Sequence, residues 1–97
     1  MPTYIALVNW TEQGVREFKG TLDRAEAVTQ LAQQLGGSQT ALYWTIGPYD
    51  LVSLAEFPDD ESATAFALAV SSQGNVRTTT MRAFDASEMG GIIDKLG

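Results

Sequence analysis

The chain has 97 residues, 44% of them hydrophobic, and its 12 acidic and 6 basic residues give a net charge of −6. It contains no cysteine and no histidine, which excludes disulfides, thiolate nucleophiles, Ser-His-Asp triads, His-ligated haem and the usual zinc and copper centres. The negative charge has the wrong sign for broad contact with nucleic acid or an anionic membrane. We therefore expect neither of these partners.

The length fits one domain, 1–97, and a chain of this size buries roughly 60–65% of its unfolded surface. No apolar run approaches the roughly 18 residues of a membrane span. The first residues, Met1 to Tyr4, lack the basic start and apolar core of a signal peptide. We therefore expect a soluble, cytoplasmic protein.

The N-terminal part of the chain predicts a strand and a broken helix. Thr3 to Asn9 mixes β-branched, aromatic and aliphatic residues, as strands do. Apolar residues at helical spacing follow from Val15 to Leu35 and predict one apolar helix face, which includes Phe18 and Leu22. Gly20-Thr21 interrupts this run, so we expect a short helix, a kink, and a longer helix capped by Thr21 and closed by Gly36-Gly37.

The middle of the chain predicts a hairpin and a second helix. The strand-like runs Gln39 to Ile46 and Asp50 to Phe57 are separated by the turn residues Gly47-Pro48-Tyr49 and should pair antiparallel. Pro58-Asp59-Asp60-Glu61 opens a helix with acids at the positive end of its dipole. This helix should end by Gln73-Gly74.

The C-terminal part predicts a fourth strand and a short helix. Asn75 to Phe84 is rich in threonine and valine, which favour strands. Ser87 can cap a final helix, which Gly90-Gly91 weakens. The apolar residues of that helix should face inward: Met89, Ile92, Ile93 and Leu96.

The predicted element order is the split βαβ arrangement of a ferredoxin-like α+β domain, with a four-stranded antiparallel sheet and an added C-terminal helix. We expect right-handed crossovers to place the first and third strands parallel at the centre. Helices cover one face of such a sheet, yet Ile5 and Leu7 point to one face while Tyr4, Ala6 and Val8 point to the other. A bare apolar face is rare on a monomer. We therefore predict a homodimer, or a higher homo-oligomer, whose sheets stack about a two-fold axis.

Four segments carry a recognisable pattern: Asn9-Trp10-Thr11, Tyr43 to Asp50, Pro58 to Glu61 and Gly74 to Phe84. Together they resemble the GYD-domain family of small bacterial proteins over nearly the whole chain. The Gly-Tyr-Asp signature of that family stands here as Gly47-Pro48-Tyr49-Asp50, with a proline inserted. The resemblance implies a place near the dimeric α/β-barrel proteins, which include cofactor-free monooxygenases, isomerases, haem-handling enzymes and small-ligand sensors. It names no reaction.

The hairpin turn holds the candidate catalytic residues, Tyr49 and Asp50. As a general base or ligand anchor, Asp50 needs a desolvated carboxylate with a raised pKa, and Tyr49 would donate its hydroxyl. On the plainer interpretation, Asp50 accepts backbone N–H groups at the turn and Tyr49 packs against the sheet or a partner subunit.

A second set of residues is the candidate ligand-binding group: Asn9, Trp10, Trp44, Asn75 and Arg77. The two tryptophans could equally be core or interface aromatics. Arg77 and Arg82 stand five apart on one strand and so point to opposite faces.

The expected topology separates the candidate residues into two polar patches. We place the hairpin turn, with Tyr49-Asp50, beside Tyr4 and the end of the fourth strand. The Asn9-Trp10 corner, Asn75 and Arg77 should then lie together at the opposite end of the sheet.

Three functions are compatible with these residues. The preferred interpretation is a dimer that binds a small hydrophobic or aromatic molecule in a cleft between sheet and helices, oriented by Asn75 or Arg77. The alternatives are a cofactor-independent enzyme of the monooxygenase or isomerase type with Asp50 as its base, and an assembly protein with the motif at the subunit interface. We expect no cofactor and no metal, since adjacent acids such as Asp59-Asp60-Glu61 diverge at a helix start.

Overall fold

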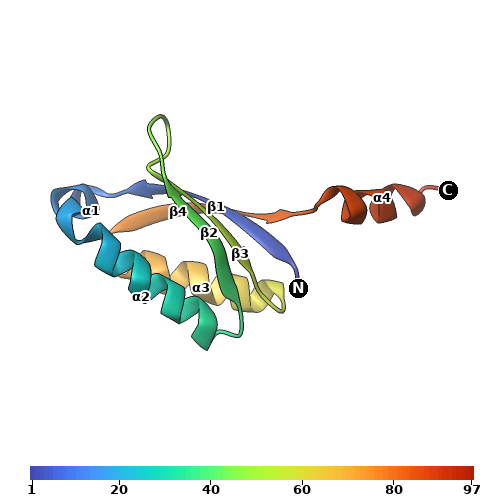
Figure 1. Cartoon of the computed structure of the whole chain (residues 1–97), viewed down its shortest axis with the longest axis horizontal. Coiled ribbons are helices and arrows are strands. Elements are labelled where there is room, and N and C mark those ends of the chain that lie inside the picture. Colours follow the sequence, from blue (N-terminus) through green and yellow to red (C-terminus); the bar gives the residue numbers. More distant parts are fainter.

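The computed structural model describes all 97 residues, which form four strands and four α-helices. The elements in chain order are β1 (Thr3–Trp10), α1 (Glu12–Arg16), a 3-10 turn (Phe18–Gly20), α2 (Thr21–Gln34), β2 (Ser38–Trp44), β3 (Leu51–Glu56), α3 (Asp60–Ser72), β4 (Val76–Ala83) and α4 (Ala86–Asp94). Helices α2 and α3 lie on one face of the sheet, while α4 projects from the end of β4 (Figure 1). The ferredoxin-like α+β fold is therefore confirmed. None of the helices is both long enough and apolar enough to span a bilayer.

The sheet has the strand order β2-β3-β1-β4, and each pair of neighbours is antiparallel. The expectation of parallel central strands is wrong: β1 and β3 are adjacent, but Val8 lies opposite Leu51 and Thr3 opposite Glu56. The reason is that the β2–β3 hairpin reverses the chain, so the crossover through α2 makes β2 parallel to β1 and the hairpin inserts β3 between them. The hairpin turn consequently lies at the C-terminal end of β1.

The core lies between the helices and the inner face of the sheet. Phe57 is its largest fully buried side chain, and its ring packs edge-on against Tyr4 and at 5.0 Å, centre to centre, from Phe66. Tyr4 and Val8 are buried, while Ile5 and Leu7 are half-buried on the opposite face. The predicted division of β1 into two apolar faces is therefore confirmed.

The helix ends differ in part from expectation. Thr11 caps α1 by accepting the Gly14 N–H, and Asp59 caps α3 by accepting the Ser62 N–H, which lowers the pKa of Asp59. The expected cap of α2 is wrong, since that position is Gly20. The helix is instead preceded by the 3-10 turn, so Thr21 is already inside α2 and its hydroxyl is free for another contact.

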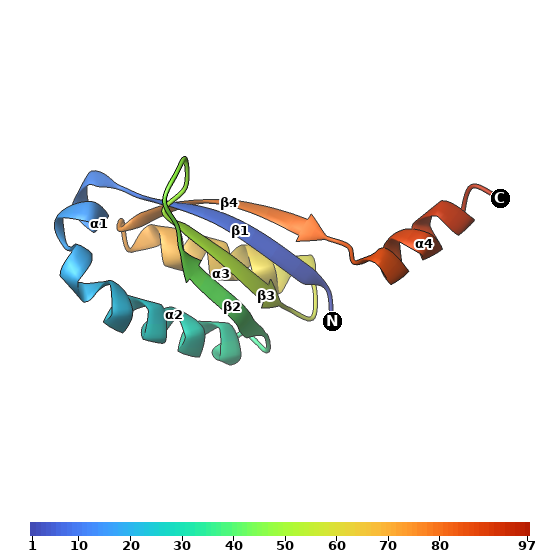
Figure 2. The ribbon, with the colours of Figure 1, turned by 45° about the horizontal axis from the view of Figure 1, so that its top comes forward.

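Helix α4 does not pack on the rest of the chain, contrary to the expectation that its apolar side chains face inward. Every residue from 84 to 97 is exposed, and the helix extends the molecule along its 52 Å long axis (Figures 1 and 2). Asp85, rather than Ser87, caps α4, in a reciprocal capping box with Glu88. The helix is therefore well formed although it lacks a packing partner.

Candidate functional site

The hairpin turn, residues 45–50, is fastened to the end of β1. The Asp50 N–H donates to the Val8 carbonyl at 2.8 Å, and the Trp10 N–H donates to Asp50 Oδ2 at 2.9 Å. Within the turn, the Thr45 hydroxyl donates to the Tyr49 carbonyl at 2.6 Å. The Asp50 carboxylate thus accepts a backbone N–H, as the plainer interpretation of this residue requires.

The structure brings together residues that we expected to lie apart. Asp50 contacts Trp10 directly, and Asn9 pairs with Arg77 across the β1–β4 ladder. Tyr4 and Arg82 pair at the opposite end of the same ladder. The expectation of two polar patches, with the hairpin turn beside Tyr4, is therefore wrong, and it failed because the direction of β3 was misassigned.

Asn75 ties α1 to the turn between α3 and β4. Its carbonyl accepts the Thr11 N–H at 3.0 Å, and its side-chain oxygen accepts a hydrogen bond from Gln13 Nε2 at 2.9 Å. Gly14 lies so close that a Cβ atom there would fall 1.9 Å from the Asn75 carbonyl oxygen. Asn75 therefore has a structural role in this corner, which the sequence did not indicate.

A cavity of about 100 Å³ lies between α2, α3 and the inner face of the sheet. Small side chains leave this space open, among them Ala25 on α2 and Ala67 on α3, and 15 of the 23 lining residues are hydrophobic. Of the five predicted ligand-binding residues, Trp10 and Asn75 line the cavity. The other three do not: Asn9, Trp44 and Arg77.

The polar groups in the cavity wall already have partners. Gln39 Nε2 donates to Ser53 Oγ at 2.8 Å, and the Thr29 hydroxyl is 2.9 Å from Gln39 Oε1. No buried side-chain nitrogen or oxygen lacks a hydrogen bond, and no cluster of three or more acids could hold a metal ion. The cavity therefore offers mainly apolar contact.

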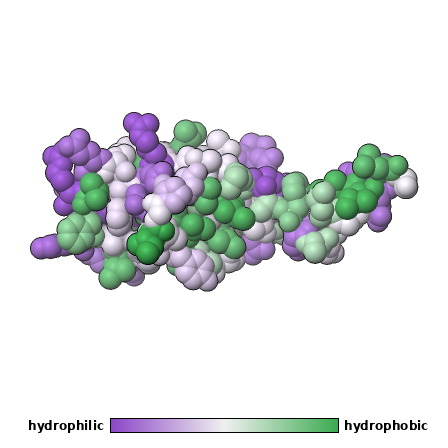
Figure 3. Space-filling model, turned by 90° about the horizontal axis from the view of Figure 1, so that it is seen from above, coloured by the Kyte–Doolittle hydropathy of each residue, from purple (hydrophilic) through white to green (hydrophobic).

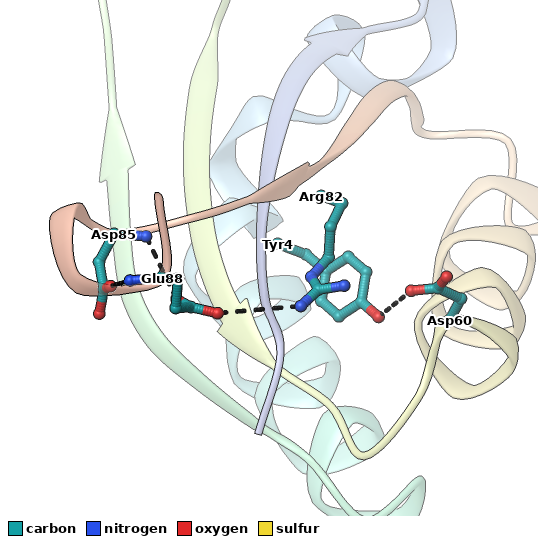
Figure 4. A network of polar contacts seen from close by, with 5 residues as sticks. All are labelled: Tyr4, Asp60, Arg82, Asp85 and Glu88. Atoms are coloured by element: carbon teal, nitrogen blue, oxygen red, sulfur yellow. Dashed lines mark hydrogen bonds and ion pairs between the residues drawn. The ribbon is translucent and has the colours of Figure 1, made fainter. Parts of the chain in front are cut away.

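A polar network connects the inner face of the sheet to α4 (Figure 4). The Tyr4 hydroxyl donates to Asp60 Oδ1 at 2.5 Å. Burial, and then the hydrogen bond to Asp60 and its negative charge, raise the pKa of Tyr4 to about 12. The Arg82 guanidinium lies 5.9 Å from the Tyr4 ring centre, and its Nη2 is 3.9 Å from Glu88 Oε2. This network could not be found from the sequence because it depends on the register between β1 and β4.

An exposed apolar patch lies where α1, the 3-10 turn and α2 meet, and we call it the α1–α2 corner. It comprises Val15, Phe18, Leu22 and Trp44, with Phe18 and Leu22 53% and 69% exposed. The Trp44 indole N–H donates to the Thr21 hydroxyl at 3.0 Å, which holds the indole beside the start of α2. The expectation that Val15, Phe18 and Leu22 belong to a buried helix face is therefore wrong.

Arg24 holds the α1–α2 corner in shape. Its guanidinium donates to the Glu17 carbonyl at 2.8 Å and to the Gly14 carbonyl at 3.4 Å. Both acceptors belong to the segment that bends the chain from α1 into α2. The apolar side chains of the corner therefore project from a backbone that is fixed at both ends of the bend.

Comparison with known proteins assigns the chain to a family. A family model of the GYD domain matches residues 4–93. The glutamine synthetase and cystathionine beta-lyase binding protein of Thermus thermophilus is 31% identical over 90 residues, which are 92% of this chain and 95% of that protein. The crystal structure of TTHA0845 from Thermus thermophilus has a TM-score of 0.58 at 27% identity, covering 89% of this chain and 96% of that chain.

A second solved structure shares the fold alone. The crystal structure of an FFRP protein has a TM-score of 0.60 at 17% identity, covering 87% of this chain and 100% of that chain. The family match, in contrast, spans all four strands and reaches into α4. The chain is therefore a member of the GYD domain family.

Proposed function

We propose that this protein acts by binding other proteins, with the α1–α2 corner as its docking surface. The observation that carries the proposal is the joint exposure of Phe18, Leu22 and Trp44 on one corner of the fold. Aromatic side chains, surrounded by aliphatic neighbours and a polar rim, are the usual energetic centre of protein interfaces.

The contacts of the corner support this role. Arg24 fixes the bend, and the Trp44–Thr21 hydrogen bond limits the rotation of the indole. A partner that binds here orders few additional groups, so less of the interaction energy is lost to conformational entropy. At the rim, Arg16 and Glu12 form an exposed ion pair at 3.0 Å, as is typical of the solvated edge of an interface.

The relative from Thermus thermophilus supports a protein as the partner. It is named for binding glutamine synthetase and cystathionine beta-lyase. We extend this kind of activity to the present chain and expect a cytoplasmic enzyme with an apolar recess that receives Phe18 and Leu22. The partner's recess would bury side chains that one copy of the chain leaves in water.

Binding assays with purified glutamine synthetase and cystathionine beta-lyase test the proposal. We expect at least one enzyme to bind the wild type, and Phe18→Asp to weaken that binding about 30-fold, because a hot-spot residue contributes about 2 kcal/mol. Leu68→Asp is the matched control, since Leu68 is 67% exposed on α3, outside the corner. The proposal fails if neither enzyme binds, or if Phe18→Asp and Leu68→Asp bind equally well.

The cavity supports a second candidate function, the binding of a small apolar molecule. Its volume of about 100 Å³ suits one small ring or alkyl group, since an apolar cavity of roughly 150 Å³ accepts benzene. Asp50 is not among the lining residues, so we assign no chemistry to this site. A ligand held there would contribute apolar contact to both helices and the sheet.

Thermal-shift assays with benzene and indole test the second candidate. A ligand at 100 times its dissociation constant stabilises the folded state by about 2.7 kcal/mol, a shift easily measured for a domain of this size. Ala67→Leu should fill the cavity and remove the shift, whereas Ala65→Leu, at an exposed position of the same helix, should retain it. A wild-type protein that neither compound stabilises would refute the candidate.

A further inference from the structure

The outer face of the sheet is a continuous apolar surface with no cover. Leu54, Ile5 and Met81 form a row across β3, β1 and β4, and Val52 and Leu7 form the neighbouring row. Hydrophobic side chains gather over the sheet in the view onto this face (Figure 3). No segment of the chain lies over it, because α2 and α3 occupy the other face (Figures 1 and 2).

Two further apolar elements lie at opposite ends of the molecule. The hairpin turn rises on the side of the sheet away from the helices, with Ile46 fully exposed at its tip (Figure 1). At the other end, α4 exposes Met89, Ile92 and Ile93. Neither element can reach the other within one chain, since the molecule is 52 Å long.

We propose that a second copy of this chain covers the outer face, and that the hairpin turn of each copy packs against α4 of the other. The two-fold axis lies between the stacked sheets and runs perpendicular to their strands. Rotation about this axis places each end of one sheet over the opposite end of its partner. The interaction goes beyond the proposed function and uses none of the side chains of the α1–α2 corner.

The charges on the outer face favour this orientation. Arg77 lies on the outer face at the hairpin end, opposite Asn9, and Glu56 lies at the other end, opposite Thr3. The perpendicular axis places each Arg77 over the Glu56 end of the partner subunit. An axis parallel to the strands would instead stack Arg77 on Arg77, and would bring the two projecting hairpins together in a complex of two chains that each carry a net charge of −6.

The available area matches what a stable dimer requires. Four strands spaced about 4.8 Å apart, each about eight residues long at about 3.3 Å per residue, present roughly 500 Å². One side of α4, about 14 Å long and about 10 Å wide, adds roughly 140 Å². A standard interface buries roughly 600–1,000 Å² on each partner. The sheets alone fall short of this range, and the contact between hairpin and α4 brings the interface into it.

The direction of α4 is set before any partner binds. Asp85 and Glu88 form the capping box at its start, and Glu88 also contacts Arg82 at the end of β4 (Figure 4). A helix held in this way presents Ile92 and Ile93 in a fixed position. A second copy would therefore meet a preformed surface.

Engineered cysteines test the geometry, because the natural chain contains none. A disulfide requires Cα atoms less than about 7 Å apart. We expect a mixture of Ile46→Cys and Ile93→Cys proteins to form a covalent dimer that contains one of each under mild oxidation, with at least tenfold more product than either variant alone. Cross-linking of Ile46→Cys with itself would show that the axis runs along the strands and would overturn the proposal.

Sedimentation velocity gives an independent test without cysteines. The wild type should sediment as a dimer at micromolar concentration, and Ile46→Asp should raise the dimer dissociation constant at least tenfold. Leu68→Asp again provides the control, since it adds the same charge on the helix-covered side and should remain dimeric. A monomeric wild type, or an Ile46→Asp protein as dimeric as the control, would overturn the proposal.

Discussion

Residues 3–83 and residues 84–97 are both rich in apolar side chains, but only the first segment buries them. Phe57 is 1% exposed, whereas Leu96 is 89% exposed and no residue of α4 is buried. Helix α4 is nevertheless regular and carries a complete capping box. Its apolar side chains therefore do not stabilise the isolated chain, and their placement has to be explained by an interaction with another molecule.

Phe57→Ala should give the largest effect on the compact segment. Truncation of a buried phenylalanine removes its apolar contacts and leaves a cavity, which costs about 3–5 kcal/mol. Here it would also remove the ring contacts with Tyr4 and Phe66. Urea denaturation followed by circular dichroism should show this loss. A change below about 1 kcal/mol would mean that the core does not depend on the buried residues of the first segment.

Gly14→Ala should destabilise the corner between α1 and the α3–β4 turn by about 1–3 kcal/mol, because the added methyl group would overlap the Asn75 carbonyl. Thermal denaturation would measure the effect. Gly90→Ala is the control, since no atom lies within 4 Å of a Cβ at that position. The control should be neutral or slightly stabilising, as expected for alanine in place of glycine within a helix.

Tyr4→Phe should cost about 1 kcal/mol, the usual contribution of one hydrogen bond, and should change the dependence of stability on pH. The pKa of Tyr4 is about 12 in the folded chain, above its ordinary value of 10.0. The folded state therefore retains this proton more tightly, so the contribution of Tyr4 to the free energy of unfolding is complete below pH 10 and falls between about pH 10 and 12. Denaturation curves across this interval should be steeper in pH for the wild type than for Tyr4→Phe.

Ile92→Ser should have the smallest effect. At concentrations low enough to keep the chain monomeric, we expect the free energy of unfolding to change by less than about 0.5 kcal/mol, since the side chain is exposed. Amide hydrogen exchange should show fast exchange throughout α4 under the same conditions and slow exchange in β1. Strong protection of α4 in the monomer would remove the distinction between the two segments.

The parts of the fold that local sequence determines were predicted well. Asp59 caps α3 because the Pro58-Asp59-Asp60 sequence suits a helix start, and alternation along β1 identifies its two faces. The direction of β3 was wrong because it depends on how the hairpin re-enters the sheet, which is a property of the topology. That single error moved Asp50 to the wrong end of the molecule.

The candidate site was predicted less well, because its contacts join distant parts of the chain. Asn75 was a candidate ligand residue, but the close approach of Gly14 to its carbonyl becomes visible only when α1 and the α3–β4 turn are placed together. Trp44 was a candidate of the same kind, and its partner Thr21 was assigned to a helix cap instead. Periodicity identified the apolar residues of α4 and could not show that the chain leaves them unburied.

The central position of β1 also affects how the protein is made on the ribosome. The first strand to be synthesised lies between β3 and β4, so its two neighbours come from residues 51–56 and 76–83. During translation β1 has no neighbour until the hairpin emerges, and its ladder with β4 waits for nearly the whole chain. The nascent chain therefore exposes an apolar strand for most of its synthesis, and the sheet is completed only shortly before the chain is released.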